Sequence, residues 1–351
     1  MLYDLIRNSF SLDICKIIAI EAFAVALVVF LLTLLATRLI LPILKAKKMN
    51  QPINMYVLEH SGKSGTPTMG GICFIIASLV AMLIWIVLEK LGVMGENNGR
   101  ALLPLVLTLC LGVGNGIIGF IDDYKKLVKK ENEGLNESQK LILQIVIATA
   151  YLCMMGMTGN LATSFAIPFT DISLELGWFA YPLYLLVIVG FVNSTNITDG
   201  LDGLASSVGV SVSMGILAMA VFTCSRYTGI TAAMLMGALL GFLVFNHYPA
   251  KVFMGDTGSL FIGGIIMGCA IGEGQLLAVI IMSMVFILDM LSSLWQRLYY
   301  KLTDGKRFFK KAPVHHHFQL KNWSEIKIVT VFFLVSIMFC AIGVLGAILP
   351  L

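Results

Sequence analysis

The sequence predicts an all-α polytopic membrane protein, and three properties of the 351-residue chain support that prediction. The mean hydropathy is +0.91, 58% of the residues are hydrophobic, and only 13% are charged. Apolar stretches close to the ~20 residues that cross a bilayer recur along the whole chain. A soluble globular protein is therefore excluded, and residues 1–351 are expected to form a single integral membrane domain.

Ten transmembrane helices are expected, one for each long apolar stretch. The N-terminus shows no signal-peptide order of basic head, short apolar run and cleavage site, so the first helix is expected to be retained. Between the fourth and fifth helices, alternating apolar residues from Phe165 to Leu174 predict a small outer hairpin. The predicted helices cover residues 17–40, 70–90, 101–121, 140–157, 178–193, 204–223, 229–245, 258–272, 276–300 and 326–349.

The basic residues indicate the orientation. Cytoplasmic loops of membrane proteins are enriched in Lys and Arg. An outer N-terminus puts nineteen of the 24 Lys and Arg residues on the cytoplasmic side and five outside. The net charge of +4 therefore reflects topology, and no nucleic-acid partner is expected. The seven cysteines show no spacing typical of zinc or redox sites and are interpreted as small hydrophobic core residues.

Five aspartates lie at the cytoplasmic edge in this topology, as do all five histidines. Ionisable residues are costly near a bilayer, so they are functional candidates by default. Polar groups that only anchored helix ends would divide between the two surfaces. We therefore predict one functional site at the cytoplasmic face, containing Asp122, Asp123, Asp199, Asp202 and Asp256.

Asp122 and Asp123 are expected at the C-terminal end of the third helix, where the helix dipole disfavours anions by ~0.3–1 kcal/mol. Adjacent carboxylates repel each other, an arrangement that suits a base beside a charge stabiliser or a metal ligand. The alternative is a solvated helix end that is neutralised by Lys125, Lys126, Lys129 and Lys130.

The segment from Asn196 to Gly203 is expected to be a short inner loop. Its two glycines let the backbone approach a ligand closely, and the amide of Asn196 suits recognition of a base or sugar. The alternative is that Asp202 only caps the helix beginning near Leu204.

Asp256 lies on a glycine-rich turn that precedes the eighth helix. Such a carboxylate suits Mg²⁺, which takes one or two carboxylates together with phosphate oxygens. The alternative is that Asp256 or Thr257 is only a helix cap. Asn246 and Phe253, at the two ends of the loop, offer an amide and a stacking face for a planar base.

His315, His316 and His317 follow the ninth predicted helix. Consecutive helical residues project about 100° apart, so the three imidazoles cannot all bind one metal from one helix. Together with the basic cluster at 306–311 they fit a diphosphate site, and a solvated polar turn is the alternative.

Two glycine-containing segments have different interpretations. The turn before the second helix carries Lys63, a flexible cation able to meet a phosphate. The G-x-G-x-x-G spacing from Gly114 to Gly119 lies inside an apolar helix with no strand before it, so it indicates close helix packing. No Walker A sequence is present, and a nucleotide is therefore expected to be a substrate.

Taken together, these groups suit a reaction that joins two anions at the membrane surface. If a lipid phosphate attacks a nucleotide diphosphate, a metal and cations must offset the repulsion between the reactants. The apolar body would then hold a polyprenyl chain while its headgroup reaches the water edge.

Five segments in order resemble the phospho-N-acetylmuramoyl-pentapeptide transferases, within the polyprenyl-phosphate N-acetylhexosamine-1-phosphate transferase superfamily. The resemblance runs from about residue 38 to the C-terminus. It implies transfer of phospho-MurNAc-pentapeptide from UDP-MurNAc-pentapeptide to undecaprenyl phosphate, giving lipid I and UMP with Mg²⁺. It also implies a homodimer in a bacterial inner membrane, surrounded by membrane lipid, with the active site facing the cytoplasm. The segments are 66–71, 122–124, 196–203, 253–260 and 313–318.

The resemblance also implies roles for individual residues. Asp256 is expected to bind Mg²⁺, and Asp122 to deprotonate the lipid phosphate beside Asp123, although a two-step route with an aspartate nucleophile stays open. The expected uridine pocket comprises Lys63, Gly200, Leu201, Asp202, Asn246 and Phe253. Residues expected near the diphosphate and sugar are Asn196, Asp199 and the catalytic His315, and the substrate-binding set also includes Thr68, Lys140, His316 and His317.

Two other functions are considered. A sister transferase that moves GlcNAc-1-phosphate to the same lipid would share the acidic loops, but the triple histidine and the sequence 66–71 favour the muramoyl branch. A secondary transporter would place polar groups near the bilayer midplane in two related halves. Here they gather at one edge, and no internal repeat is evident.

Overall fold

The computed structural model describes residues 14–46, 65–92, 102–129 and 134–349. Within these ranges nine helices are long and apolar enough to cross a membrane, and the bent pair α10–α11 makes a tenth if it is counted as one span. The prediction of an all-α polytopic membrane protein is confirmed. The elements are α2 (Ile14–Ala46), α3 (Gly71–Lys90), α4 (Leu102–Lys129), α5 (Glu137–Met157), β1 (Ser164–Ala166), β2 (Ser173–Glu175), η2 (Gly177–Phe179), α6 (Ala180–Thr198), α7 (Leu204–Phe222), α8 (Arg226–Asn246), α9 (Gly255–Gly272), α10 (Leu276–Met282), α11 (Met284–Leu302), α12 (Val314–Gln319) and α13 (Glu325–Ile348).

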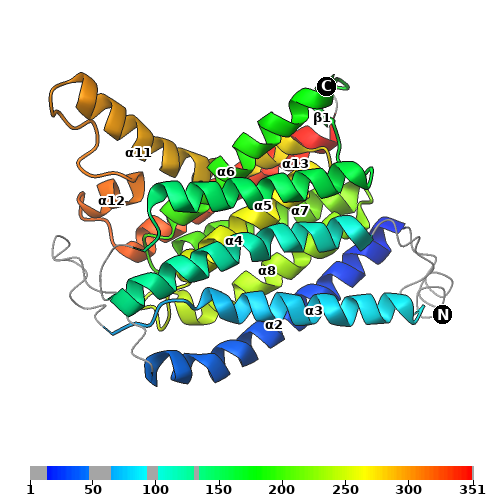
Figure 1. The fold of residues 1–351 in the computed structure, drawn as a ribbon, viewed down its shortest axis with the longest axis horizontal. Coiled ribbons are helices and arrows are strands. Elements are labelled where there is room, and N and C mark those ends of the chain that lie inside the picture. Colours follow the sequence, from blue (N-terminus) through cyan, green and yellow to red (C-terminus); the bar gives the residue numbers. More distant parts are fainter. Residues whose placement is uncertain (1–13, 47–64, 93–101, 130–133, 350–351) are drawn as a thin grey trace.

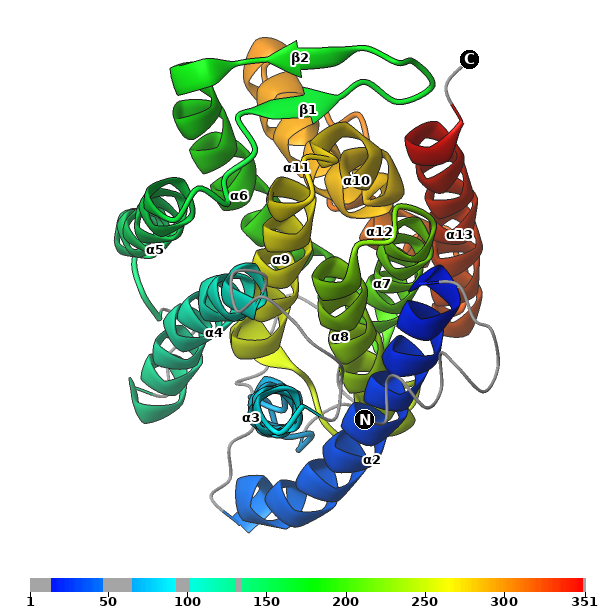
Figure 2. The ribbon, with the colours of Figure 1, turned by 90° about the vertical axis from the view of Figure 1, so that its right-hand side faces the viewer.

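The long helices lie side by side along the longest axis of the molecule (Figure 1). Helix α9 occupies the centre, between α4 and α8 (Figure 2), and nearly all of its residues are buried. Helices α2, α3, α5 and α13 lie further out and present large apolar side chains on the surface, as expected where a helix faces lipid. The central helix is therefore packed against other helices, whereas the outer surface of the bundle is apolar.

Helix α4 packs on α9 through a row of glycines. A Cβ atom added at Gly112 would lie 2.5 Å from the Ile265 side chain, and one added at Gly119 would collide with the carbonyl oxygen of Asp256. Gly116 lies between them, next to Phe261. Lipid gives no hydrophobic drive for one helix to join another, so close contact between small residues holds such helices together. The interpretation of this glycine spacing as helix packing is confirmed.

Helix α4 extends to Lys129, about two turns beyond the predicted end at residue 121. The expectation that Asp122 and Asp123 lie at the helix terminus is therefore wrong. Both aspartates lie within the helix, and so do Lys125 and Lys126, the second of which lies one turn after Asp122 on the same face.

The ninth predicted span is not one straight helix. Helices α10 and α11 meet at an angle of 75° at Ser283, where the backbone has φ −92° and ψ 10°. Figure 1 shows α11 leaning away from the bundle toward α12. Neither Pro nor Gly lies in this stretch, and the apolar sequence continues across the bend, so the bend could not be predicted from the sequence.

The predicted hairpin lies at the end of the bundle opposite to α12 (Figure 1). Strands β1 and β2 pair in antiparallel fashion with Phe165 opposite Leu174, which confirms it. At the same end, Cys15 and Cys224 form a disulfide across 209 residues of sequence. The interpretation of all cysteines as core residues is therefore wrong for this pair, and also for Cys110 and Cys153, which are exposed.

The glycine row yields a stability prediction. Gly119→Ala should lower the free energy of unfolding by about 1–3 kcal/mol, because the added methyl group meets backbone that cannot rotate away. Thermal unfolding in detergent measures the change. Gly190→Ala on α6 is the matched control, since a Cβ there meets nothing within 4 Å. Equal melting temperatures for the two variants would contradict the tight α4–α9 contact.

Candidate active site

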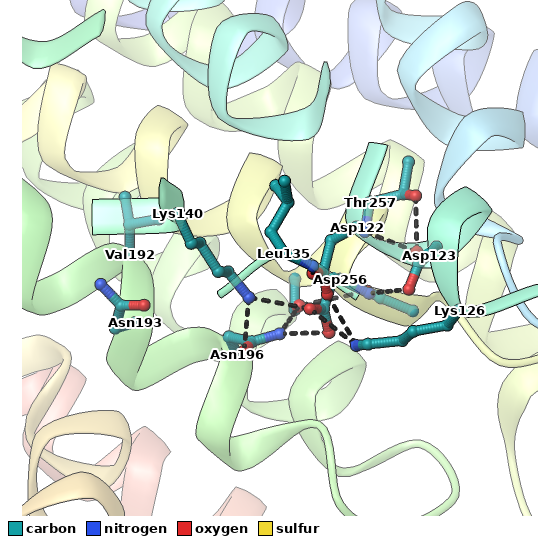
Figure 3. Close-up of polar contacts among 12 residues, drawn as sticks. Asp122, Asp123, Lys126, Leu135, Lys140, Val192, Asn193, Asn196, Asp256 and Thr257 are labelled. Atoms are coloured by element: carbon teal, nitrogen blue, oxygen red, sulfur yellow. Dashed lines mark hydrogen bonds and ion pairs between the residues drawn. The ribbon is translucent and has the colours of Figure 1, made fainter. Parts of the chain in front are cut away.

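Three carboxylates from distant parts of the chain meet at one end of the bundle. Asp122 and Asp123 come from α4 and Asp256 comes from the first turn of α9. One carboxylate oxygen of each lies within 4.8 Å of the others. Figure 3 shows the three side chains converging with two lysines. The structure thus brings together three of the five aspartates that the sequence analysis selected.

Asp123 caps the N-terminus of α9. Its carboxylate accepts hydrogen bonds from the backbone N–H groups of Asp256 (3.2 Å) and Thr257 (3.0 Å) and from the Thr257 hydroxyl (2.7 Å). Such N–H groups have no partner within the helix, and the positive end of the helix dipole favours an anion. The alternative in which Asp256 or Thr257 is itself the cap is therefore wrong, because α4 provides the capping carboxylate.

Asp122 is held from two sides. Its Oδ2 atom lies 2.7 Å from Nζ of Lys126, one turn further along α4, and its Oδ1 accepts from the backbone N–H of Leu135 at 2.6 Å. Lys126 also lies 3.2 Å from Oδ2 of Asp256. One ammonium group therefore bridges the two aspartates across the helix pair.

Asp256 receives further donors from α5 and α6. Lys140 Nζ lies 2.8 Å from Oδ2, and the amide of Asn196 donates to Oδ1 at 2.8 Å. Asn196 also donates to the Ser259 hydroxyl at 2.9 Å and accepts from Lys140 at 3.3 Å. Side chains from α4, α5 and α6 therefore meet the Asp256 carboxylate of α9. The position of Lys140 at the start of α5 brings its ammonium group within reach of that carboxylate.

Asp199 adds a carboxylate that has no cationic partner among the described residues. It is half-buried at the C-cap of α6, and no described side chain donates a hydrogen bond to it. Desolvation by burial, followed by the charges of Asp256, Asp123 and Asp202, raises the pKa of Asp199 well above its usual range. Carboxylates in this region therefore outnumber the two lysines, a balance that a divalent cation or a cationic ligand would correct.

The segment before α3 pairs with the loop before α9. The N–H of Gly70 donates to the Phe253 carbonyl at 2.8 Å, and the N–H of Phe253 donates to the Pro67 carbonyl at 2.9 Å. Thr68 is 2% exposed, and its hydroxyl has no hydrogen-bond partner among the described residues. Lys63, in the same predicted motif, lies outside the described residues.

The loop after α6 lies against the loop after α8. Asp202 accepts from the backbone N–H of Ala250 at 2.9 Å. The alternative in which Asp202 caps α7 is wrong: the N-cap is Gly203, with φ +76° and no side-chain cap. Asn246 accepts from the Ser206 hydroxyl at 2.8 Å and donates to a carbonyl of its own loop at 3.0 Å. Gly200 and the buried Leu201 belong to the same junction, so Gly200, Leu201, Asp202 and Asn246 are neighbours among the residues predicted for the uridine pocket.

The three histidines of α12 have different hydrogen-bond partners. Nδ1 of buried His315 lies 2.7 Å from Oδ2 of Asp289 on α11. Nδ1 of His316 lies 2.6 Å from a glutamine oxygen on the same helix, and Nδ1 of His317 accepts from the backbone N–H of Lys310 at 3.1 Å. The prediction that the three imidazoles do not bind one metal agrees with this arrangement.

Three residues with direct contacts in this region were not selected as site residues from the sequence. Lys126 was named only as one of the lysines that would neutralise a solvated helix end. Lys126 follows Asp122 by four positions, which is the spacing of an ion pair on a helix, but the predicted helix ended too early to use it. Thr257 was considered only as a cap. Asp289 is an acid inside an apolar stretch, and that feature alone was a usable signal.

Comparisons with known proteins agree with this geometry. Residues 104–273 match the model for glycosyl transferase family 4, and residues 63–75 match phospho-N-acetylmuramoyl-pentapeptide-transferase signature 1. The phospho-N-acetylmuramoyl-pentapeptide-transferase of Halalkalibacterium halodurans is 40% identical over 318 residues, 90% of this chain and 94% of that protein. The Bacillus subtilis protein of the same name is 40% identical over 317 residues, with the same coverage. The Staphylococcus aureus protein (strain bovine RF122) is 40% identical over 326 residues, 92% of this chain and 98% of its own.

The chain belongs to the phospho-N-acetylmuramoyl-pentapeptide-transferase family. The region that matches the glycosyl transferase model contains the three clustered aspartates, both lysines and the loop with Asp199. The family signature covers the segment that pairs with Phe253. The residues that the structure joins are therefore distributed over both matched regions.

Asp199 yields a prediction for this transferase family member. A carboxyl whose pKa is raised in the folded state destabilises the fold once pH rises above its unfolded value of about 3.9. Asp199→Asn should therefore raise the melting temperature at pH 7, and the difference should disappear below about pH 3, where the carboxyl is protonated in both the folded and the unfolded state. Asp171→Asn, on the exposed hairpin, is the control. A lower melting temperature for Asp199→Asn at pH 7 would contradict the raised pKa of Asp199 in the folded protein.

Proposed function

We propose that this protein transfers phospho-N-acetylmuramoyl-pentapeptide from UDP-MurNAc-pentapeptide to undecaprenyl phosphate, releasing UMP and forming lipid I for peptidoglycan synthesis. The proposal rests on the cluster of Asp122, Asp123 and Asp256 with Lys126 and Lys140 at one end of an apolar helix bundle. Membership of a family named for this transfer supports the same reaction. Both substrates are anionic and one carries a long apolar chain, so a charged site at a membrane edge suits both.

Mg²⁺ fits the donor set at this site. Three carboxylates offer oxygens within 4.8 Å of one another, and hard oxygen ligands are those that Mg²⁺ prefers. Asp256 would hold the ion, with Asp122 beside it and substrate phosphate oxygens completing the coordination. When bound, Mg²⁺ would offset the negative charge of the phosphates and act as a Lewis acid toward them.

The aspartates and lysines of the cluster have different proposed roles in the reaction. The Asp123 carboxylate is occupied by three donors of α9, which favours a structural task for it. Asp122 contacts one backbone N–H and the ammonium of Lys126, a flexible group that a phosphate can attract away. We therefore assign Asp122 as the base that deprotonates the lipid phosphate for direct attack. Lys126 and Lys140 would bind phosphate oxygens and reduce the repulsion between the reactants.

The remaining contacts to substrate are proposed from the loops around this cluster. Uridine would bind between the loops after α6 and α8, and the diphosphate and sugar between Asn196, Asp199 and α12. We further propose a homodimer in a bacterial cytoplasmic membrane with the site facing the cytoplasm, in agreement with the distribution of basic residues. Residues proposed to contact substrate are Lys63, Thr68, Lys140, Asn196, Asp199, Gly200, Leu201, Asp202, Asn246, Phe253, His315, His316 and His317.

The reaction is tested by mass spectrometry of products. Purified protein with UDP-MurNAc-pentapeptide, undecaprenyl phosphate and Mg²⁺ should yield lipid I and UMP in equal amounts. Omission of the lipid should abolish UMP release. Turnover with UDP-GlcNAc alone would instead identify the sister transferase, and uptake of a nucleotide-sugar into vesicles without UMP release would identify a transporter.

The metal role is tested at Asp256. Asp256→Ala should reduce Mg²⁺-dependent product formation by at least about a hundredfold, because it removes the carboxylate on which both lysines converge. Size-exclusion chromatography in detergent should show a folded protein. Asp171→Ala on the exposed hairpin is the control and should keep full activity. Substantial activity in Asp256→Ala would exclude this carboxylate as the metal ligand.

A further inference from the structure

A buried aspartate outside the acidic cluster is paired with one of the histidines. Asp289 is 0% exposed on α11, and the described contacts of its carboxylate are both with His315. Oδ2 lies 2.7 Å from Nδ1 of the imidazole, and Oδ1 accepts from the backbone N–H of the same residue at 3.4 Å. A buried carboxylate is costly unless it is paired, so Asp289 and His315 form a unit.

The pairing determines which ring nitrogen carries hydrogen. A carboxylate only accepts hydrogen bonds, so Nδ1 of His315 must be the N–H donor to Asp289. In the neutral imidazole, Nε2 then presents a lone pair. This atom is fully buried and has no hydrogen-bond partner among the described residues. Buried polar atoms are nearly always paired, so an unpaired one indicates a partner that arrives from outside the chain.

Nε2 is directed at the loop between α6 and α7. A Cβ atom at Gly200 would collide with Nε2 and would lie 3.0 Å from Cε1. Gly200 stands next to Asp199 and two positions before Asp202, and it is partly exposed. The lone pair therefore lies at the edge of the loop where we propose that the nucleotide-linked sugar binds.

We propose that Asp289 is a positioning residue for the transfer reaction: it fixes His315 in the Nδ1–H form, so that Nε2 accepts a hydrogen bond from a hydroxyl or amide N–H of the donor substrate beside Gly200. This inference rests on the proposed function for its kinetic consequences. Carboxylate partners of metal-binding histidines fix the ring in the same way, and their loss typically reduces metal affinity or activity about 10- to 100-fold.

The kinetic test compares three substitutions. Asp289→Asn should lower kcat/KM for the nucleotide-sugar by about 10- to 100-fold, because an amide also permits the other tautomer. Asp289→Glu keeps a carboxylate and should recover most of that loss. Combining Asp289→Asn with His315→Ala should cost little more than His315→Ala alone, since both act through one imidazole. Additive losses, or full activity of Asp289→Asn, would overturn the proposal.

A matched control separates positioning from stability. The Ser292 hydroxyl accepts from the backbone N–H of Val314 at 2.9 Å, so it also joins α11 to α12, but it does not touch the imidazole. Ser292→Ala should retain activity within about threefold. If Ser292→Ala and Asp289→Asn lose activity and melting temperature alike, the aspartate only holds α12 in place.

Nitrogen-15 NMR of labelled histidine provides a readout that needs no turnover. The His315 signals, assigned by their loss in His315→Gln, should show a protonated Nδ1 and an unprotonated Nε2, and Asp289→Asn should change that pattern. An unchanged pattern would overturn the proposal. If the unsubstituted protein transfers no phospho-sugar, the proposed function fails, whereas the NMR comparison still decides the role of Asp289.

Discussion

The close contact of α4 with α9 is the constraint on which the rest of the site depends. The two helices run in opposite directions, so the acidic end of α4 meets the first turn of α9. Gly119 lies against the Asp256 carbonyl, and this absence of a side chain sets how near the carboxylates can come. Because Asp123 then caps α9, one contact both closes the fold and fixes the charged groups.

The charged groups that form the site also reduce the stability of the fold. Carboxylates crowded into a largely buried region repel each other, and stability alone would favour fewer of them. Lys126 and Lys140 reduce the repulsion, yet within the described part of the chain no cation pairs with Asp199. Such an excess of charge is typical of sites whose ligands complete them, and anionic substrates with a divalent ion would do so.

Sequence reasoning predicted the membrane class, nine of the long helices and the hairpin, because hydropathy and alternation are local properties. It failed where the decisive interaction is between distant segments or depends on backbone geometry. The bend at Ser283 lies in an uninterrupted apolar stretch, and the partner of Cys15 lies 209 residues away. The extension of α4 was missed because charged residues end an apolar pattern without ending a helix.

The same distinction applies to the site. Polar residues clustered in short motifs identified Asp122, Asp123 and Asp256, but the motifs could not show which acid caps a helix and which stays available to a substrate. Asp289 illustrates the limit most clearly, because it stands alone in an apolar helix with no motif around it. Its meaning comes only from the bend at α10–α11 and the short helix α12, which together place His315 against it. A lone buried acid in a membrane helix is therefore best treated as one half of a pair whose partner the fold supplies.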